Sequence, residues 1–346
     1  MPDKVLLSLV RYALGTQDAE ETVRQCHVPD PSLWKEVYSL SRQQTVTGLM
    51  YQALSMLPAK MSVPEDIVLS LATKSARVEQ RSVAIRKQAE TMLNGLRRAG
   101  FSPVLMKGPA VAAFYPKPLL RESGDIDLFF SEAELPSALK LFREKGYRPV
   151  LTPDGSYFCE DRPASVDIHS RYFDLHVSKK DLPDIPSPEA TLLMLSAHIL
   201  KHAMGTGIGL RQICDMAMAY RALRGEYDCA AVVDVYKRTG LLRWNELLAG
   251  YIEARLGIPC PVAGESADLS RLDRVIFEGG DFGHYARGRR KKLGQNPVLR
   301  KIDTASRLFR KASFGIRYAP REYFCRLKEL GTGNFAFGRK RKDSNV

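Results

Sequence analysis

Two aspartates one residue apart, inside an apolar run, are the residues of this chain best placed to do chemistry. Asp125 and Asp127 stand in the segment Gly124-Asp125-Ile126-Asp127-Leu128-Phe129-Phe130. If this segment is a β-strand, both carboxylates point to the same face, because residues i and i+2 share a face. Neighbouring buried carboxylates repel each other unless a cation or hydrogen-bond donors compensate. Mg²⁺ and Mn²⁺ take oxygen ligands of this kind, so the pair predicts a divalent metal site.

A third carboxylate lies farther along the chain, in a second strand-like segment. Asp167 belongs to Val166-Asp167-Ile168-His169. Two acids on one strand and a third on a neighbouring strand can hold two ions about 3.5–4 Å apart. Such ions neutralise a triphosphate and lower the pKa of an attacking hydroxyl, as phosphoryl-group transfer requires. Asp125, Asp127 and Asp167 are therefore the predicted catalytic and metal-binding residues.

Fixed positive charge precedes the aspartate pair. Lys107 is followed by Gly108, and Arg121 stands four residues before Asp125. Ammonium and guanidinium groups suit triphosphate oxygens. Gly108, at a predicted strand-to-helix turn, permits close approach of the backbone to an anion, and a helix N-terminus there also favours anions.

The elements that must position these groups form a short α/β unit. Apolar runs and turn signals predict strands at 102–106, 125–130, 147–151, 156–159 and 164–171, with helices at 109–115 and 131–145. Ser131 and Glu134 form a capping-box pattern, and Pro153-Asp154-Gly155 predicts a hairpin turn between the third and fourth strands. The order of these strands and helices predicts a small mixed sheet.

Both flanks of this unit show helical periodicity. In the first 100 residues a helix is predicted to begin at Asp30-Pro31, with an apolar face running to Leu57, and a second to run from Pro64 to Gly100. Further helices are predicted at 191–204, 210–223 and 227–256, and the chain is expected to loosen after Pro261. The predicted fold class is α+β, a small mixed sheet between helical N- and C-terminal domains.

Composition narrows the class of protein. The 346 residues are 45% hydrophobic and 26% charged, as in an ordinary globular protein. No apolar run approaches the roughly 18 residues needed to span a bilayer, and the first residues lack the pattern of a signal peptide. Six cysteines are scattered without CxxC spacing, which indicates reduced thiols. We therefore expect a cytoplasmic protein without a transmembrane segment.

The positive charge is concentrated at the C-terminus. Residues 284–346 carry a net charge of +14 against +13 for the whole chain, so the body is nearly neutral. Within this tail, residues 298–312 predict a basic amphipathic helix, and basic clusters stand at 289–292 and 339–342. Three interpretations stay open: packing over the body with some attraction for anions, which ranks first, contact with nucleic acid, or contact with an acidic membrane surface.

The residues around the aspartates resemble a known family. Met106-Lys107-Gly108, Tyr115-Pro116-x-Pro118 and Arg121-x-Ser123-Gly124-Asp125-Ile126-Asp127-Leu128 are similar to the uncharacterised bacterial nucleotidyltransferase family of the polymerase-beta-like superfamily. The strand 166–169 resembles that family's later Asp-x-His strand. The family's downstream motifs resemble His198-x-x-x-His202, Asp215 and the turn at 279–283. The resemblance covers roughly residues 30–285. Abortive-infection nucleotidyltransferase toxins share a weaker likeness.

The resemblance implies metal-dependent transfer of a nucleoside monophosphate from an NTP to an acceptor, with release of diphosphate. It implies Mg²⁺ or Mn²⁺ bound by Asp125 and Asp127, with Asp167 as a further ligand or the general base. The NTP-binding residues that it implies are Lys107, Gly108, Arg121, Ser123, His169 and His202. Pro109 follows Gly108 where many superfamily members have Ser. The implied domains are a helical region (1–100), a catalytic core (101–180), a second helical region (181–283) and a basic tail (284–346).

Several alternatives stay open at this level. The acceptor is a small molecule, a protein or RNA, and a toxin that modifies tRNA or a protein is one such case. A protein of another class, non-catalytic and binding nucleic acid or membrane through its basic tail, is the rival hypothesis. His198 and His202 lie one helical turn apart and are expected to be a packed pair lining the cleft, with zinc binding less favoured. Asp215 orients either Arg211 or one of these histidines.

Overall fold

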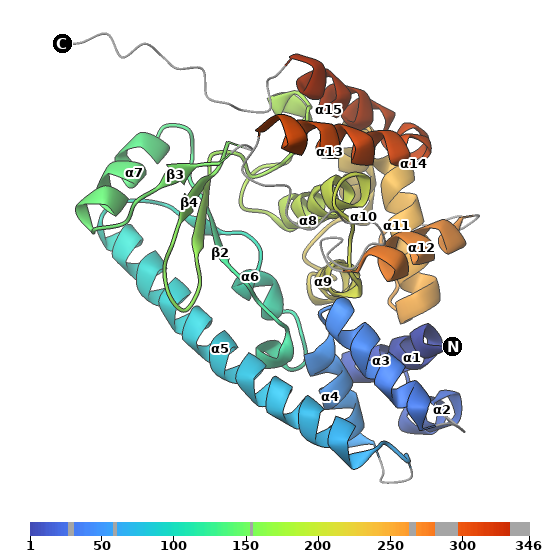
Figure 1. Cartoon of the computed structure of the whole chain (residues 1–346). Helices are drawn as coiled ribbons and strands as arrows, with labels where there is room; N and C mark the ends of the chain where they lie inside the picture. Colours follow the sequence, from blue (N-terminus) through green and yellow to red (C-terminus); the bar gives the residue numbers. More distant parts are fainter. Residues whose placement is uncertain (27–30, 58–60, 153–154, 263–267, 281–296, 333–346) are drawn as a thin grey trace, which may run out of the picture.

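One small mixed sheet lies between long helices (Figure 1). The computed structural model describes residues 1–26, 31–57, 61–152, 155–262, 268–280 and 297–332. Among these residues five strands pair in the order β1-β2-β5-β4-β3. Their bounds are β1 (Val104–Leu105), β2 (Ile126–Phe129), β3 (Val150–Leu151), β4 (Tyr157–Cys159) and β5 (Val166–His169). The predicted α+β class is confirmed, and each strand lies within its predicted segment but is shorter.

The pairing of β2 with β5 is parallel, whereas the other strand pairs are antiparallel. The predicted hairpin is confirmed as the pair β3 and β4, although residues 153–154 of its turn lie outside the described residues. The side chains of β2 and β5 alternate between two environments. Their apolar members, Ile126, Leu128, Val166 and Ile168, are fully buried in a core that the sheet shares with α5 (Glu65–Arg98) and α7 (Leu135–Glu144). The opposite face carries the polar residues of these strands.

Helix α5 joins the two hydrophobic cores of the protein. Near its beginning, Ile67 and Leu71 belong to the larger core, and farther on Ile85 and Leu93 belong to the core of the sheet. Acidic residues in its first turn and arginines in its last turn complement the helix dipole. The long helix predicted from Pro64 to Gly100 is confirmed, and it runs along the sheet unit in Figure 1.

The predicted helical N-terminal region is also confirmed, but its middle differs from the expectation. Its other helices are α1 (Pro2–Leu14), α2 (Ala19–Gln25), α3 (Ser32–Gln43) and α4 (Thr47–Met56). The apolar face expected to run to Leu57 is divided between α3 and α4, where Thr45 has a φ of 54°. The cause is tertiary, because the Gln44 side chain donates to the Ile276 carbonyl and accepts from the Leu210 amide. Asp30 lies outside the described residues.

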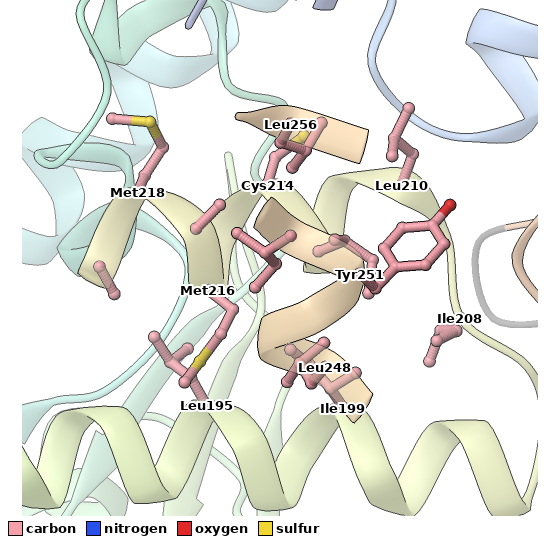
Figure 2. Packing of buried hydrophobic residues seen from close by; sticks show 14 of the residues in the cluster. Leu195, Ile199, Ile208, Leu210, Cys214, Met216, Met218, Leu248, Tyr251 and Leu256 are labelled. Carbon is pink, nitrogen blue, oxygen red and sulfur yellow. The ribbon is translucent and has the colours of Figure 1, made fainter. Parts of the chain in front are cut away.

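The helices after the sheet enclose the larger core. They are α8 (Pro188–Met204), α9 (Leu210–Ala222), α10 (Cys229–Arg238), α11 (Leu242–Leu256) and α12 (Leu269–Gly279). Shorter helical turns occur elsewhere in the chain: α6 (Pro109–Ala112), η1 (Pro118–Leu120) and η2 (Lys179–Asp181). Figure 2 shows side chains of α8, α9 and α11 converging, with Leu195, Met216 and Leu248 among them. The helices predicted from 191 to 256 are confirmed.

Two expectations about the C-terminal third need correction or refinement. The loosening expected after Pro261 is wrong for 269–279, because α12 forms and buries Leu272 and Ile276 in the larger core. The expected amphipathic helix is α13 (Pro297–Arg310), which α14 (Ala312–Tyr318) and α15 (Pro320–Thr332) follow. Phe314 and Tyr323 are buried, so this segment packs on the body. The basic clusters at 289–292 and 339–342 lie outside the described residues.

No helix among the described residues combines the length and the apolar character that crossing a bilayer demands.

Candidate functional site

A cavity of about 520 Å³ opens on the polar face of β2 and β5. The turn at residues 106–108 and the two strands line one part of it, and α8 and α9 line another. Its volume lies within the range of about 300–1,000 Å³ that is usual for ligand sites. Most of the residues that the sequence singled out line this cavity, including Asp125, Asp127, Asp167, Lys107, Gly108, Arg121, His169, His198, His202 and Asp215.

Asp127 and Asp167 stand directly opposite each other on the paired parallel strands. His169 follows Asp167 by two residues and therefore shares its face. One ligand atom from each of these three side chains lies within 4.8 Å of the others, which makes them a potential metal-binding group among the described residues. Asp125 lies just before β2 and lines the same cavity, but it is not a member of this group.

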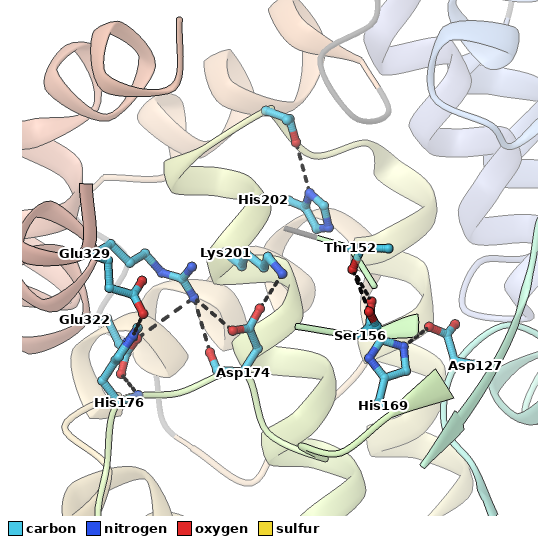
Figure 3. A network of polar contacts seen from close by, with 12 residues as sticks. Asp127, Thr152, Ser156, His169, Asp174, His176, Lys201, His202, Glu322 and Glu329 are labelled. Atoms are coloured by element: carbon cyan, nitrogen blue, oxygen red, sulfur yellow. Dashed lines mark hydrogen bonds and ion pairs between the residues drawn. The ribbon is translucent and has the colours of Figure 1, made fainter. Parts of the chain in front are cut away.

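Two nitrogen donors converge on a single oxygen of Asp127. The Lys107 Nζ lies 2.7 Å from Asp127 Oδ1, and the His169 Nε2 lies 2.9 Å from the same atom. Figure 3 shows the His169 ring directed at this carboxylate. Burial disfavours the ionised form of Asp127, but Lys107 and His169 outweigh it and hold its pKa well below the usual value. Asp127 is therefore an ionised carboxylate over the physiological pH range.

Asp167 has the opposite electrostatic environment. Burial, followed by the charges of Asp127 and Asp125, raises the pKa of Asp167 to about 6. Its Oδ1 atom is buried and accepts no hydrogen bond from the described residues. Burial and Asp127 also raise the pKa of Asp125. Lys107 therefore does not fully compensate the negative charge of the three carboxylates, and a divalent cation bound among them would do so.

Gly108 is required by the local geometry of the site. Its φ is +49°, and a Cβ atom at this position would lie 2.8 Å from the carbonyl oxygen of Asp125. Gly108 precedes α6 and follows Lys107, so it sets the direction in which the chain leaves β1. The close approach of this turn to Asp125 brings the lysine into the cavity.

Arg121, expected to contact the triphosphate, is committed to Asp215 on α9. Its Nη2 lies 2.6 Å from Asp215 Oδ2 and its Nε lies 3.0 Å from Oδ1. The Tyr115 hydroxyl donates to the same carboxylate at 2.7 Å, and Arg121 Nη1 donates to Ser123 Oγ at 3.0 Å. Asp215, predicted to orient Arg211 or a histidine, instead makes its closest contacts with Arg121, and Arg211 Nη1 is 3.7 Å away. Arg121 therefore connects the segment before β2 to the helical half.

His198 and His202 form the expected packed pair. Their ring centroids are 4.6 Å apart, and the His202 Nδ1 lies 2.9 Å from Thr206 Oγ1. Burial, followed by Lys201 and Lys107, lowers the pKa of His202 to about 3, and burial lowers that of His198 well below its usual value. Both imidazoles are therefore neutral at pH 7. Neither belongs to a metal-binding group within the described part of the chain.

Several cavity residues were missed by sequence reasoning. Lys201 of α8, Arg211 of α9, and Arg171 and Asp174 after β5 all line the cavity. Lys201 Nζ lies 2.5 Å from Asp174 Oδ2, and Arg326 of α15 also contacts Asp174 (Figure 3). No spacing signal in the sequence marks these residues, because three different segments bring them together. Lys201, Arg211 and Arg171 add cationic groups to the lining of the cavity, and Asp174 adds a further carboxylate.

The fold and this cavity define an α+β protein with a nucleotidyltransferase-like core. The family model described as uncharacterised nucleotidyltransferase matches residues 30–257, about two thirds of the chain. The chain therefore belongs to that family, as the motifs predicted. The likeness predicted for residues 279–283 falls beyond this match. Neither a curated protein nor a solved structure matches the chain.

Proposed function

We propose that this protein transfers a nucleoside monophosphate from an NTP to an acceptor hydroxyl and releases diphosphate. The observation that supports this most is the direct pairing of Asp127 with Asp167 on adjacent parallel strands, at the wall of a cavity of about 520 Å³. Family membership supports nucleotidyl transfer in general. The metal dependence, the placement in the polymerase-beta-like superfamily and the roles of individual residues belong to the proposal.

The residues present fit a divalent ion. Asp127 is ionised, and Asp167 carries a buried oxygen that accepts no hydrogen bond within the described part of the chain, so both can give oxygen ligands. Asp125 lines the same cavity and would complete the carboxylate set, as a ligand or through water. When bound, Mg²⁺ or Mn²⁺ neutralises charge on the phosphates and lowers the pKa of a coordinated hydroxyl.

Side chains of the protein are assigned to proton transfer and to binding of the triphosphate. The acceptor oxygen forms a bond to the α-phosphorus as the bond from that phosphorus to the bridging oxygen breaks, and diphosphate leaves with the electron pair. Asp167 lines the same cavity and is the carboxylate proposed to take the acceptor's proton. Lys107, Lys201 and Arg211 line the cavity and are the cations proposed to contact the triphosphate.

Other residues position or recognise the substrate. Arg121 acts through Asp215 and Ser123, so it is proposed as a positioning residue in place of a triphosphate ligand. Gly108 permits the turn that carries Lys107. The neutral His198 and His202 can exchange hydrogen bonds with the base, the ribose or the acceptor.

Calorimetric titration of each of the four NTPs, with Mg²⁺ and then with Mn²⁺, tests the proposal. We expect one or more NTPs to bind, and binding to weaken at least about tenfold in Asp127→Asn because the metal link to the phosphates is lost. The matched control is Asp234→Asn, which removes an exposed carboxylate from α10. Transfer is then measured as diphosphate release and as α-phosphate label retained on an acceptor from a cell extract.

Absence of binding by all four NTPs would overturn the proposal. So would anion binding that survives Asp127→Asn but disappears on removal of residues 284–346, because that result fits the non-catalytic alternative. Expression toxicity relieved by Asp127→Asn would identify the acceptor as a component that the host cell needs.

A further inference from the structure

His169 occupies a place in the cavity that a metal ligand would occupy. It lies on β5 two residues after Asp167, with both residues on the cavity face, and it pairs in register with Phe129 of β2. Its Nε2 atom is 2.9 Å from Asp127 Oδ1. The ligand atoms of Asp127, Asp167 and His169 lie within 4.8 Å of one another. Two ligand atoms bound to one ion lie at most about twice the metal–ligand bond length apart, and that bond length is roughly 2.0–2.3 Å. Small side-chain movements would therefore let the three atoms bind one ion.

Lys107 cannot be a metal ligand, although it also contacts Asp127. Its Nζ lies 2.7 Å from the same Asp127 oxygen, and a lysine ammonium group has no lone pair to offer a metal. An imidazole with its proton on Nδ1 presents the Nε2 lone pair to the carboxylate side. Among the nitrogen atoms that touch Asp127, the one on His169 is therefore the available metal donor.

We propose that His169 is a direct ligand of the metal, together with Asp127 and Asp167, and that this set selects Mn²⁺ over Mg²⁺. The inference rests on the proposed function, because it assigns the ion on which that function depends. Imidazole is a softer donor than carboxylate oxygen and suits first-row transition ions, whereas Mg²⁺ favours oxygen and keeps its waters. A neutral imidazole ligand also adds no negative charge to attract Mg²⁺.

A second arrangement of the same atoms gives a different role. If Nε2 carries the proton and donates to Asp127, His169 only orients that carboxylate from outside the coordination sphere. Both arrangements predict weaker metal binding when the residue is removed. Only direct coordination places a nitrogen nucleus on the ion, and this difference decides the experiment.

The experiment uses Mn²⁺ alone as the probe, on the full chain, with pulsed electron paramagnetic resonance. We expect modulation from a directly bound ¹⁴N nucleus in the native protein and its loss in His169→Gln. His176→Gln is the matched control, because His176 binds Glu322 and Glu329 outside this cavity and the substitution should leave the signal unchanged. Circular dichroism melts establish that each variant is folded.

Metal selectivity gives a second readout. Competition between Mn²⁺ and Mg²⁺ should show that His169→Gln weakens Mn²⁺ binding at least about tenfold and Mg²⁺ binding less. His169→Asp should recover Mg²⁺ binding and shift the preference toward Mg²⁺, since it restores an all-oxygen set.

The outcomes separate this inference from the proposed function. Bound Mn²⁺ without ¹⁴N modulation, or modulation that survives His169→Gln, overturns the assignment of His169, even if NTP transfer is observed. Nitrogen-coordinated Mn²⁺ without binding of any NTP supports His169 as a ligand and overturns the nucleotidyl-transfer proposal. If Mn²⁺ does not bind at all, the assignment of His169 fails, and the NTP titrations with Mg²⁺ decide the proposed function.

Discussion

Arg121 and Asp215, 94 residues apart in the chain, form a two-point ion pair with contacts of 2.6 and 3.0 Å. The two side chains are 3% and 7% exposed, so solvent screens the pair weakly. Arg121 stands just before the segment that carries Asp125, and Asp215 lies on α9. The pair therefore holds the sheet half of the cavity against its helical half.

Asp215→Asn should lower the free energy of unfolding by about 3 kcal/mol, because the buried Arg121 charge loses its counter-charge. Asp234→Asn, at an exposed pair with Arg238, should change it by less than about 0.5 kcal/mol. Urea denaturation of both variants measures the difference. Equal effects of the two substitutions would contradict a special role for the Arg121–Asp215 pair.

Gly108→Ala should destabilise the protein by about 1–3 kcal/mol and weaken metal binding, because φ is +49° and the new methyl group would press on the Asp125 carbonyl. Gly95→Ala is the control, since no atom lies within 4 Å of its Cβ position on α5. That substitution should raise stability by about 0.5–1 kcal/mol through helix propensity. Thermal melts and Mn²⁺ titrations report the two effects, and normal metal binding in Gly108→Ala would count against the strained turn.

Removal of the Asp167 charge should stabilise the protein in the presence of a chelator. The folded-state pKa of about 6 lies above the ordinary aspartate value of about 3.9, so ionisation in the folded state costs free energy as pH rises between these values. Asp167→Asn should therefore match the native protein near pH 4 and exceed it above pH 6. The gain should be on the order of 1 kcal/mol after screening of the partly exposed carboxylate. An equal gain at pH 4 would show that its cause is not the charge.

Lys107→Gln should separate metal binding from nucleotide binding. Loss of the ammonium beside Asp127 removes a cation that competes with the metal, so Mn²⁺ affinity should rise about tenfold. NTP affinity should fall, because the triphosphate loses a proposed partner. Calorimetry of both ligands, with Lys140→Gln on the exposed side of α7 as control, tests the opposite signs. Parallel changes in both affinities would argue against this role of Lys107.

The attachment of α15 should weaken at high pH. The His176 Nδ1 and Nε2 atoms lie 2.9 Å from Glu322 and Glu329, and these contacts raise the pKa of His176 (Figure 3). Because the pKa of His176 is raised in the folded state, its contacts stabilise the protein at pH values below about 6.5. This stabilisation is lost as the pH rises through the folded-state pKa. The difference in melting temperature between the native protein and His176→Gln should shrink from pH 6 to pH 9. A constant difference would mean that packing, and not charge, explains the effect.

Local patterns were sufficient to predict much of the fold. The strands and the helix from 65 to 98 follow from side-chain alternation, helical spacing and turn residues, which are properties of neighbouring residues. The predicted contacts between Ser131 and Glu134 also form, but α7 begins at Leu135 and not directly after Ser131. Prediction failed where a distant contact decided the outcome. Gln44 divides α3 from α4 through partners at Leu210 and Ile276, and α12 exists because it covers the larger core.

The candidate site divides in the same way. The types and spacing of Asp125, Asp127, Asp167 and His169 were sufficient to predict that these side chains lie together on one face of the sheet, because alternation along a strand is a local rule. The sequence by itself thus determined the chemical groups, the family motifs and the elements that carry them. Only the tertiary structure decided that Asp127 faces Asp167 in register, that Lys107 and His169 share one oxygen, and that Arg121 binds Asp215. These relationships depend on strand pairing and on helices far along the chain, whose positions are set by burial of the whole core and not by neighbouring residues.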